Sequence, residues 1–91
     1  MKTYLISFNL SSLTVLLNRE KFFTTLKSFG YWAQINENVW LVKTNYSSLN
    51  IVTMLKTLYN YQDNVFVIEV TKDWSAFGFN PETVNWMKSM I

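Results

Sequence analysis

The run Val65-Phe66-Val67-Ile68-Glu69-Val70 (VFVIEV) is the clearest strand signal in this chain of 91 residues. All of its side chains except Glu69 are apolar, and each of those is β-branched or aromatic, which is typical of a strand with two apolar faces. A strand of this kind needs cover on both sides of its sheet. We therefore expect a sheet in which neither face is fully open to water.

Three more strands are expected upstream of this run. Bulky side chains alternate over residues 3–9 and fill both faces, which predicts a strand in the centre of the sheet. Residues 31–35 and 39–44 predict a hairpin, because the intervening Asn36-Glu37-Asn38 is typical of a turn.

Helical periodicity and capping residues predict three helices. The first begins at Asn18 as its N-cap and ends at Gly30, and residues 10–17 are left open between a loop and the start of a helix. The second follows a cap at Ser47 or Ser48 and ends within residues 60–64. Its apolar stripe consists of Ile51, Met54, Leu55 and Leu58. The third starts at Asn80-Pro81-Glu82, and its apolar face consists of Val84, Met87 and Ile91.

The resulting order is strand, helix, strand, strand, helix, strand, followed by a terminal helix. This order predicts a ferredoxin-like α+β fold, in which two helices cover one face of a four-stranded antiparallel sheet, in a single domain over residues 1–91. The terminal helix can cover part of the other face. A second copy of the chain can cover the rest, so we expect a homodimer.

Charge and composition exclude several kinds of site. Net charge is +2, and the chain has neither Cys nor His, which excludes disulfides, thiolate zinc sites, cysteine nucleophiles and Ser-His pairs. Residues 1–62 hold six basic and two acidic residues (+4), whereas residues 63–91 hold two basic and four acidic ones (−2). The first part of the chain can therefore contact phosphate weakly.

The N-terminal region has only a faint likeness to a signal peptide. Lys2 precedes an apolar stretch that reaches Leu17, but Ser, Asn and Thr residues interrupt it and no small-residue cleavage site follows. No run approaches the roughly 18 apolar residues that a membrane span needs. We expect a cytoplasmic protein without a membrane partner.

Several runs resemble the SinR-like small proteins, which are similar in fold to the Cas-two-type subunit of CRISPR adaptation. They are Tyr4-Leu5-Ile6-Ser7-Phe8, Val39-Trp40-Leu41-Val42-Lys43-Thr44 and Phe66-Val67-Ile68-Glu69-Val70-Thr71, together with Asp73-Trp74 and Gly78-Phe79. The resemblance covers nearly the whole chain and implies a ferredoxin-like homodimer. It also implies either a metal-dependent nuclease or a structural subunit that holds DNA.

The resemblance places Asn9 where nuclease members carry an Asp at the end of the first strand. An Asn brings no negative charge, so two of them would hold Mg²⁺ or Mn²⁺ poorly, and we expect neither a metal site nor a catalytic residue here. The remaining acids near the strands, Glu37, Asp63, Glu69 and Asp73, are expected to be solvated surface groups. Ser11 and Ser12 are expected to bond nearby backbone N–H groups.

Two sets of residues are candidates for contacts with partners. Basic candidates for nucleic acid are Arg19, Lys21, Lys27 and Lys43, of which Arg19 and Lys27 lie about 80° apart on a helix. Candidates for a protein interface are Trp74, Trp86, Phe66 and Ile68. Trp32 and Trp40 are expected to pack in the core or in a dimer interface, and Trp74, Phe77 and Phe79 to form an apolar lid.

Three functions fit these observations. We expect a non-catalytic homodimeric module that binds protein or nucleic acid. The alternatives are a metal-dependent endonuclease of the same family and a phage or mobile-element protein that inhibits a host defence factor.

Overall fold

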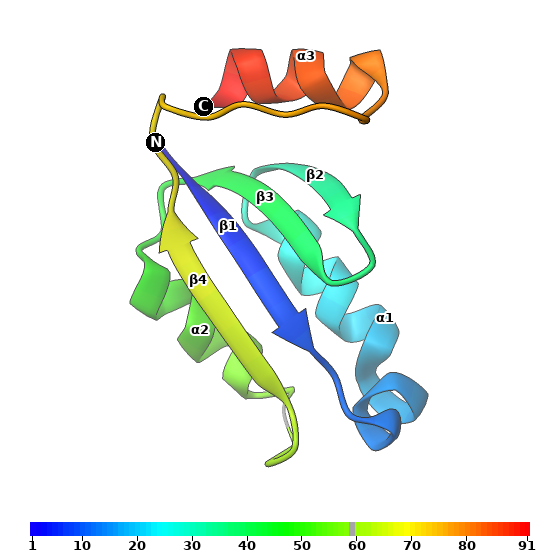
Figure 1. Cartoon of the computed structure of the whole chain (residues 1–91). Helices are drawn as coiled ribbons and strands as arrows, with labels where there is room; N and C mark the ends of the chain where they lie inside the picture. The colour runs from blue at the N-terminus through cyan, green and yellow to red at the C-terminus, as the bar shows by residue number, and fades with distance from the viewer. Residues whose placement is uncertain (59) are drawn as a thin grey trace.

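The computed structural model describes residues 1–58 and 60–91. Its elements follow the predicted order: β1 (Lys2–Asn9), α1 (Ser12–Ser28), β2 (Tyr31–Asn36), β3 (Val39–Thr44), α2 (Ser48–Lys56), β4 (Asn64–Glu69) and α3 (Pro81–Met90). In this part of the chain the four strands form one sheet, so the predicted α+β class is confirmed (Figure 1).

The sheet has the strand order β2-β3-β1-β4, and each neighbouring pair is antiparallel. α1 connects β1 to β2 across β3, and α2 connects β3 to β4 across β1, so two split βαβ units interlock. β1 is therefore a central strand, as its two apolar faces predicted. β2 and β4 are the edges.

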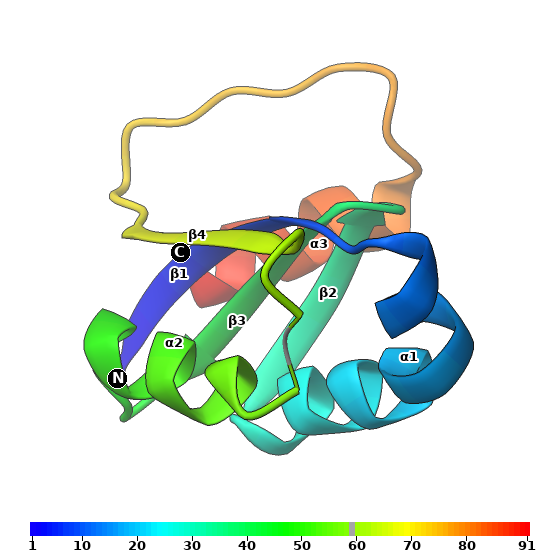
Figure 2. The same ribbon diagram turned by 90° about the horizontal axis from the view of Figure 1, so that it is seen from below.

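The core lies between the sheet and the two helices α1 and α2, which cover the same face (Figure 2). β1 and β3 contribute Tyr4, Ile6, Phe8, Trp40 and Val42, while the helices contribute Phe22, Leu26, Phe29, Ile51 and Leu55. Because side chains alternate along a strand, Leu5 and Ser7 of β1 and Leu41 of β3 face the other side of the sheet.

α3 covers part of that second face, as expected. Leu41 of β3 and Met87 of α3 are both buried, and Thr3 Oγ1 donates a hydrogen bond to the carbonyl oxygen of Met90. Met87 also lines a pocket together with Leu5, Val39 and Leu41, so α3 lies against this face. The β4 side of this face remains open, since Phe66 and Ile68 are exposed.

The start of α1 differs from the prediction. The helix begins at Ser12 rather than after Asn18, and its N-cap is Ser11, whose Oγ accepts a hydrogen bond from the backbone N–H of Thr14 (3.2 Å). The predicted role of Ser11 as a partner for backbone N–H groups is thus confirmed. The early start was hidden in the sequence because Leu13, Leu16 and Leu17 are exposed and do not repeat on the buried face.

The other two helices lie close to their predictions. Ser47 is the N-cap of α2, and Asn80 caps α3 with Pro81 in its first turn. α2 ends at Lys56, earlier than predicted, and Met54 is exposed rather than part of the buried stripe. No helix in residues 1–58 and 60–91 is long and apolar enough to cross a bilayer.

Candidate functional site

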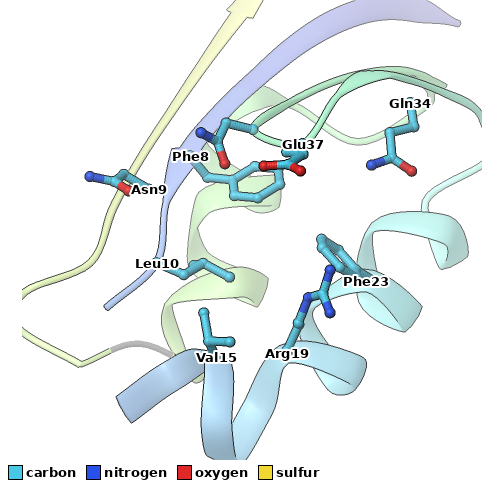
Figure 3. A pocket seen from close by; sticks show the side chains of 9 residues that line it. Phe8, Asn9, Leu10, Val15, Arg19, Phe23, Gln34 and Glu37 are labelled. Carbon is cyan, nitrogen blue, oxygen red and sulfur yellow. The ribbon is translucent and has the colours of Figure 1, made fainter. Parts of the chain in front are cut away.

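A pocket of about 260 Å³ lies at the end of β1, where the resemblance placed a catalytic position. Its lining consists of Phe8, Asn9, Leu10, Val15, Arg19, Phe23, Gln34, Glu37 and Asn38. Four parts of the chain therefore meet here: the end of β1, one side of α1, strand β2 and the turn between β2 and β3 (Figure 3). The pocket combines one carboxylate, one guanidinium and three carboxamides.

This donor set does not suit a divalent metal ion. Magnesium and manganese favour several carboxylate oxygens, but Glu37 is the only acid in the lining, and Arg19 brings a positive charge to the same pocket. In Figure 3 the Asn9 carboxamide points away from Glu37, so the two groups do not converge on one point. Residues 1–58 and 60–91 contain no group of three or more acids that could hold a metal ion.

Arg19 is held by an aromatic ring instead of an acid. Its guanidinium carbon lies 5.2 Å from the centre of the Phe23 ring, within the range of a cation–π contact. Lys27 lies farther along the same helix, and its Nζ is 5.0 Å from the centre of the Trp32 ring of β2. The two cations therefore lie along one helix, each over an aromatic ring.

Three aromatic rings in contact connect the two cations. Phe23 stacks on Trp40 with 5.5 Å between ring centres, and Trp40 lies against Trp32 at 5.0 Å. Trp40 is 1% exposed, as expected for a core residue, whereas Trp32 remains partly exposed at the β2 edge. We call Arg19, Phe23, Trp40, Trp32 and Lys27 the cation–aromatic row. The row could not be predicted from the sequence, because its five residues belong to three different elements.

The other two basic candidates lie elsewhere. Lys21 is exposed on α1 and points about 160° away from Arg19 around the helix axis. Lys43 pairs with Tyr31 across β3 and β2, whereas Trp32 pairs with Val42, so Lys43 lies on the opposite face of the sheet from Trp32. The structure therefore brings together two of the four predicted cations.

Asp63 is not the solvated surface acid that we expected. Its carboxylate accepts hydrogen bonds from the N–H of Ser11 (2.5 Å), the hydroxyl of Thr14 (2.6 Å) and the N–H of Asn60 (2.8 Å). Desolvation raises the pKa of Asp63, but these hydrogen bonds outweigh it and hold the pKa below its ordinary value. The carboxylate ties the start of β4 to the N-terminus of α1, and Ser11 is 52 residues away, so no local pattern could reveal it.

The remaining acids match the expectation. Glu37 and Asp73 are exposed, and Glu69 forms an exposed ion pair with Lys2 at 3.6 Å. Pairs of this kind contribute little to stability. Neither Glu69 nor Asp73 lines the pocket that contains Asn9.

The interface candidates divide into two groups. Phe66 and Ile68 of β4 are 59% and 48% exposed, although both are large and apolar. Trp74 and Trp86 are half-buried. The predicted lid is wrong for Phe77, which is 95% exposed, whereas Trp74 and Phe79 do line a pocket against the sheet.

A scan against protein-family models found no match to this chain, and searches of curated proteins and of solved structures found none either. The resemblance to SinR-like and Cas-two-type proteins remains a prediction.

Proposed function

We propose that the chain is a non-catalytic homodimeric binding module that associates through β4. The observation that carries this proposal is the exposure of Phe66 and Ile68 on an edge strand, 59% and 48%. An edge strand presents unpaired backbone groups that a second strand can pair with. Apolar side chains beside such an edge gain free energy when a partner covers them.

Symmetry gives the dimer a definite geometry. Two copies of β4 would pair antiparallel around a two-fold axis near Val67, which extends the sheet from one protomer into the next. Phe66 would then lie opposite the partner's Ile68 on the same face of the joint sheet. This pairing is the favourable cross-strand contact that the monomer lacks.

The same geometry agrees with a non-catalytic role. Asn9 pairs with Asn64, three residues from Val67 along β4, or about 10 Å from the proposed axis in that direction. The two Asn9 side chains of the dimer would lie on opposite sides of the axis. They would not share one ion.

The test is the oligomeric state of wild type and of the double variant Phe66→Lys/Ile68→Lys. Lysine side chains protect natural edge strands from pairing, and loss of two apolar contacts raises the dimer dissociation constant about 100-fold or more. Sedimentation equilibrium over a concentration series measures this constant. Both side chains are exposed, so the monomer keeps its fold.

The matched control is Leu16→Lys/Leu17→Lys, which removes two exposed apolar side chains from α1 instead. We expect this control to dimerise like wild type. A monomeric control beside a dimeric β4 variant would place the interface on α1 and overturn the proposal. A wild type that is monomeric at every concentration would overturn it as well.

A second candidate function is contact with a nucleic-acid backbone, which the cation–aromatic row favours. Arg19 and Lys27 lie on one helix face, with Trp32 partly exposed beside them. Two cations per chain would give a weak, salt-dependent and sequence-independent affinity.

Fluorescence anisotropy with duplex DNA and with single-stranded RNA, at about 50 and 150 mM salt, tests this second function. Arg19→Glu/Lys27→Glu should abolish the salt-dependent binding, while the control Lys21→Glu/Lys56→Glu should keep most of it. Equal loss in both variants would show that net charge, rather than the row, binds. Cleavage that requires Mg²⁺ or Mn²⁺ and increases in Asn9→Asp would favour the nuclease instead.

A further inference from the structure

An apolar pocket of about 200 Å³ lies on the second face of the sheet, beneath the chain segment of residues 70–80. The sheet contributes Leu5, Val39 and Leu41, and the opposite wall consists of Trp74, Phe79 and Met87. Figure 2 shows the segment leaving β4 and arching away from the sheet before it reaches α3. The pocket is separate from the one that contains Asn9.

The lining sets the chemistry of an occupant. Two polar side-chain groups belong to the lining residues, the hydroxyl of Ser75 and the indole N–H of Trp74. The other side chains of the lining are hydrocarbon, apart from the thioether of Met87. The neighbouring strands already pair their backbone groups with one another. A charged or sugar-like molecule would lose its hydration here without new partners, whereas an uncharged apolar molecule would not.

The size of the pocket sets the size of the occupant. Apolar cavities of about 150 Å³ stay free of water and take up benzene or xenon. A pocket of about 200 Å³ therefore suits one substituted aromatic ring.

The segment above the pocket has few restraints. Its described hydrogen bonds hold it at its two ends, from Val70 N–H to the Thr3 carbonyl (2.8 Å) and from Thr83 N–H to Asn80 Oδ1 (2.8 Å). Between these ends, the segment lines the pocket with Trp74, Ser75, Ala76 and Phe79. Gly78 has φ +86°, a backbone conformation that favours glycine, and no atom lies within 4 Å of the position that a Cβ would take.

We propose that this pocket binds an uncharged, apolar molecule of the size of one substituted aromatic ring. The bound molecule would lie between the sheet and the 70–80 segment, in contact with Trp74 and Phe79.

Methyl NMR of the ¹³C-methionine-labelled full chain tests this with toluene as the probe. Met87 lines the pocket, whereas Met54 lies on α2 on the other side of the sheet and serves as an internal control. We expect a saturable shift of the Met87 signal and none of the Met54 signal. Benzoate, which has the same ring with a charge, should shift neither.

The variant Val39→Phe places a ring inside the pocket, and it should weaken toluene binding about tenfold or more. The same exchange at Val15, outside the pocket, should leave the affinity unchanged. If Val39→Phe does not fold, the Met87 shift in wild type decides alone. Absence of a saturable Met87 shift, equal shifts at both methionines, or equal binding of benzoate would overturn the proposal.

Discussion

The two edges of the sheet have the same backbone chemistry but very different surroundings. The pairing register between β2 and β3 shifts between Gln34 and Asn36. On one face of β2, Lys27 covers the Trp32 ring, and on the other face α3 contacts the strand. β4 pairs with β1 in an unbroken register from Asn64 to Glu69 and contains neither Lys nor Pro. Bulges and covering elements are among the features that protect an edge strand, and β2 has both.

This difference shows which edge of the sheet still has apolar side chains without cover. Other elements of the same chain cover β2, whereas β4 has an apolar face without cover. The two-sided apolar pattern of residues 65–70 suggests a central strand when it is read alone. In a β4-paired dimer that pattern is explained, because the edge strand becomes an inner one.

The largest expected loss of stability comes from a substitution at Gly30, just before β2. A Cβ on this residue would overlap the carbonyl oxygen of Lys43 in β3, and the backbone there has φ +156°. Gly30→Ala should therefore lower the free energy of unfolding by about 3 kcal/mol, since neighbouring backbone has to shift. Urea denaturation of the two proteins measures the loss.

Gly78→Ala is the matched control for this substitution. Gly78 also has a positive φ, +86°, but no atom lies within 4 Å of the added Cβ. Gly78→Ala should therefore lower the free energy of unfolding by only about 1 kcal/mol, which is the cost of a positive φ for a residue with a Cβ. Equal losses in the two variants would show that backbone conformation, not contact with β3, accounts for the effect at Gly30.

The next effect concerns the anchor of β4. Asp63→Ala removes three hydrogen bonds to a carboxylate and should cost about 2 kcal/mol at pH 7. Asp73→Ala, at an exposed acid beyond β4, should change stability by less than about 0.5 kcal/mol. Urea denaturation at pH 7 separates the two outcomes, and similar values for both would contradict the role given to Asp63.

The same anchor has a defined pH dependence. The pKa of Asp63 is lowered in the folded state, so its stabilisation is complete above the unfolded value of about 4 and is lost as the pH falls through the folded pKa. Wild type and Asp63→Ala should thus converge in stability as the pH falls below about 4. A difference that stays constant down to pH 2 would contradict this assignment.

The smallest effect compares one aromatic residue at each edge. Trp32→Ala removes the ring contact with Trp40 and the cation–π contact with Lys27, and it should cost about 1 kcal/mol or slightly more. Phe66→Ala should change the stability of the monomer by less than about 0.5 kcal/mol, because this ring is already exposed. Thermal unfolding at a concentration below dimerisation makes the comparison, and a larger loss at Phe66 would reverse the order of the two edges.

Much of the fold follows from local patterns in the sequence. The alternation of residues 3–9 predicted a central strand, and the capping residues Ser47 and Asn80 predicted the starts of α2 and α3. The start of α1 did not follow, because Asp63 joins Ser11 and Thr14 only after the chain has folded. Residues 13–17 also lack a buried stripe that would have marked a helix.

The candidate site was less predictable than the fold. Helical geometry places Arg19 and Lys27 about 80° apart, and in the structure each of them lies over an aromatic ring. The rings between them come from α1, β2 and β3, so their stacking depends on the packing of three elements. The surroundings of Asn9 likewise include Glu37, whose place depends on how the β2–β3 turn folds back toward α1.

The contact between Thr3 and Met90 has a consequence for chain connectivity. These residues are 87 positions apart, yet they are joined by a hydrogen bond, and Met1 and Ile91 line the same pocket beside them. A short peptide linking residue 91 to residue 1 would permit circular permutation with new ends in the exposed 75–78 stretch. In that permutant α3 would precede β1 directly, and the contact between Thr3 and Met90 would become a local one, which lowers contact order and favours faster folding.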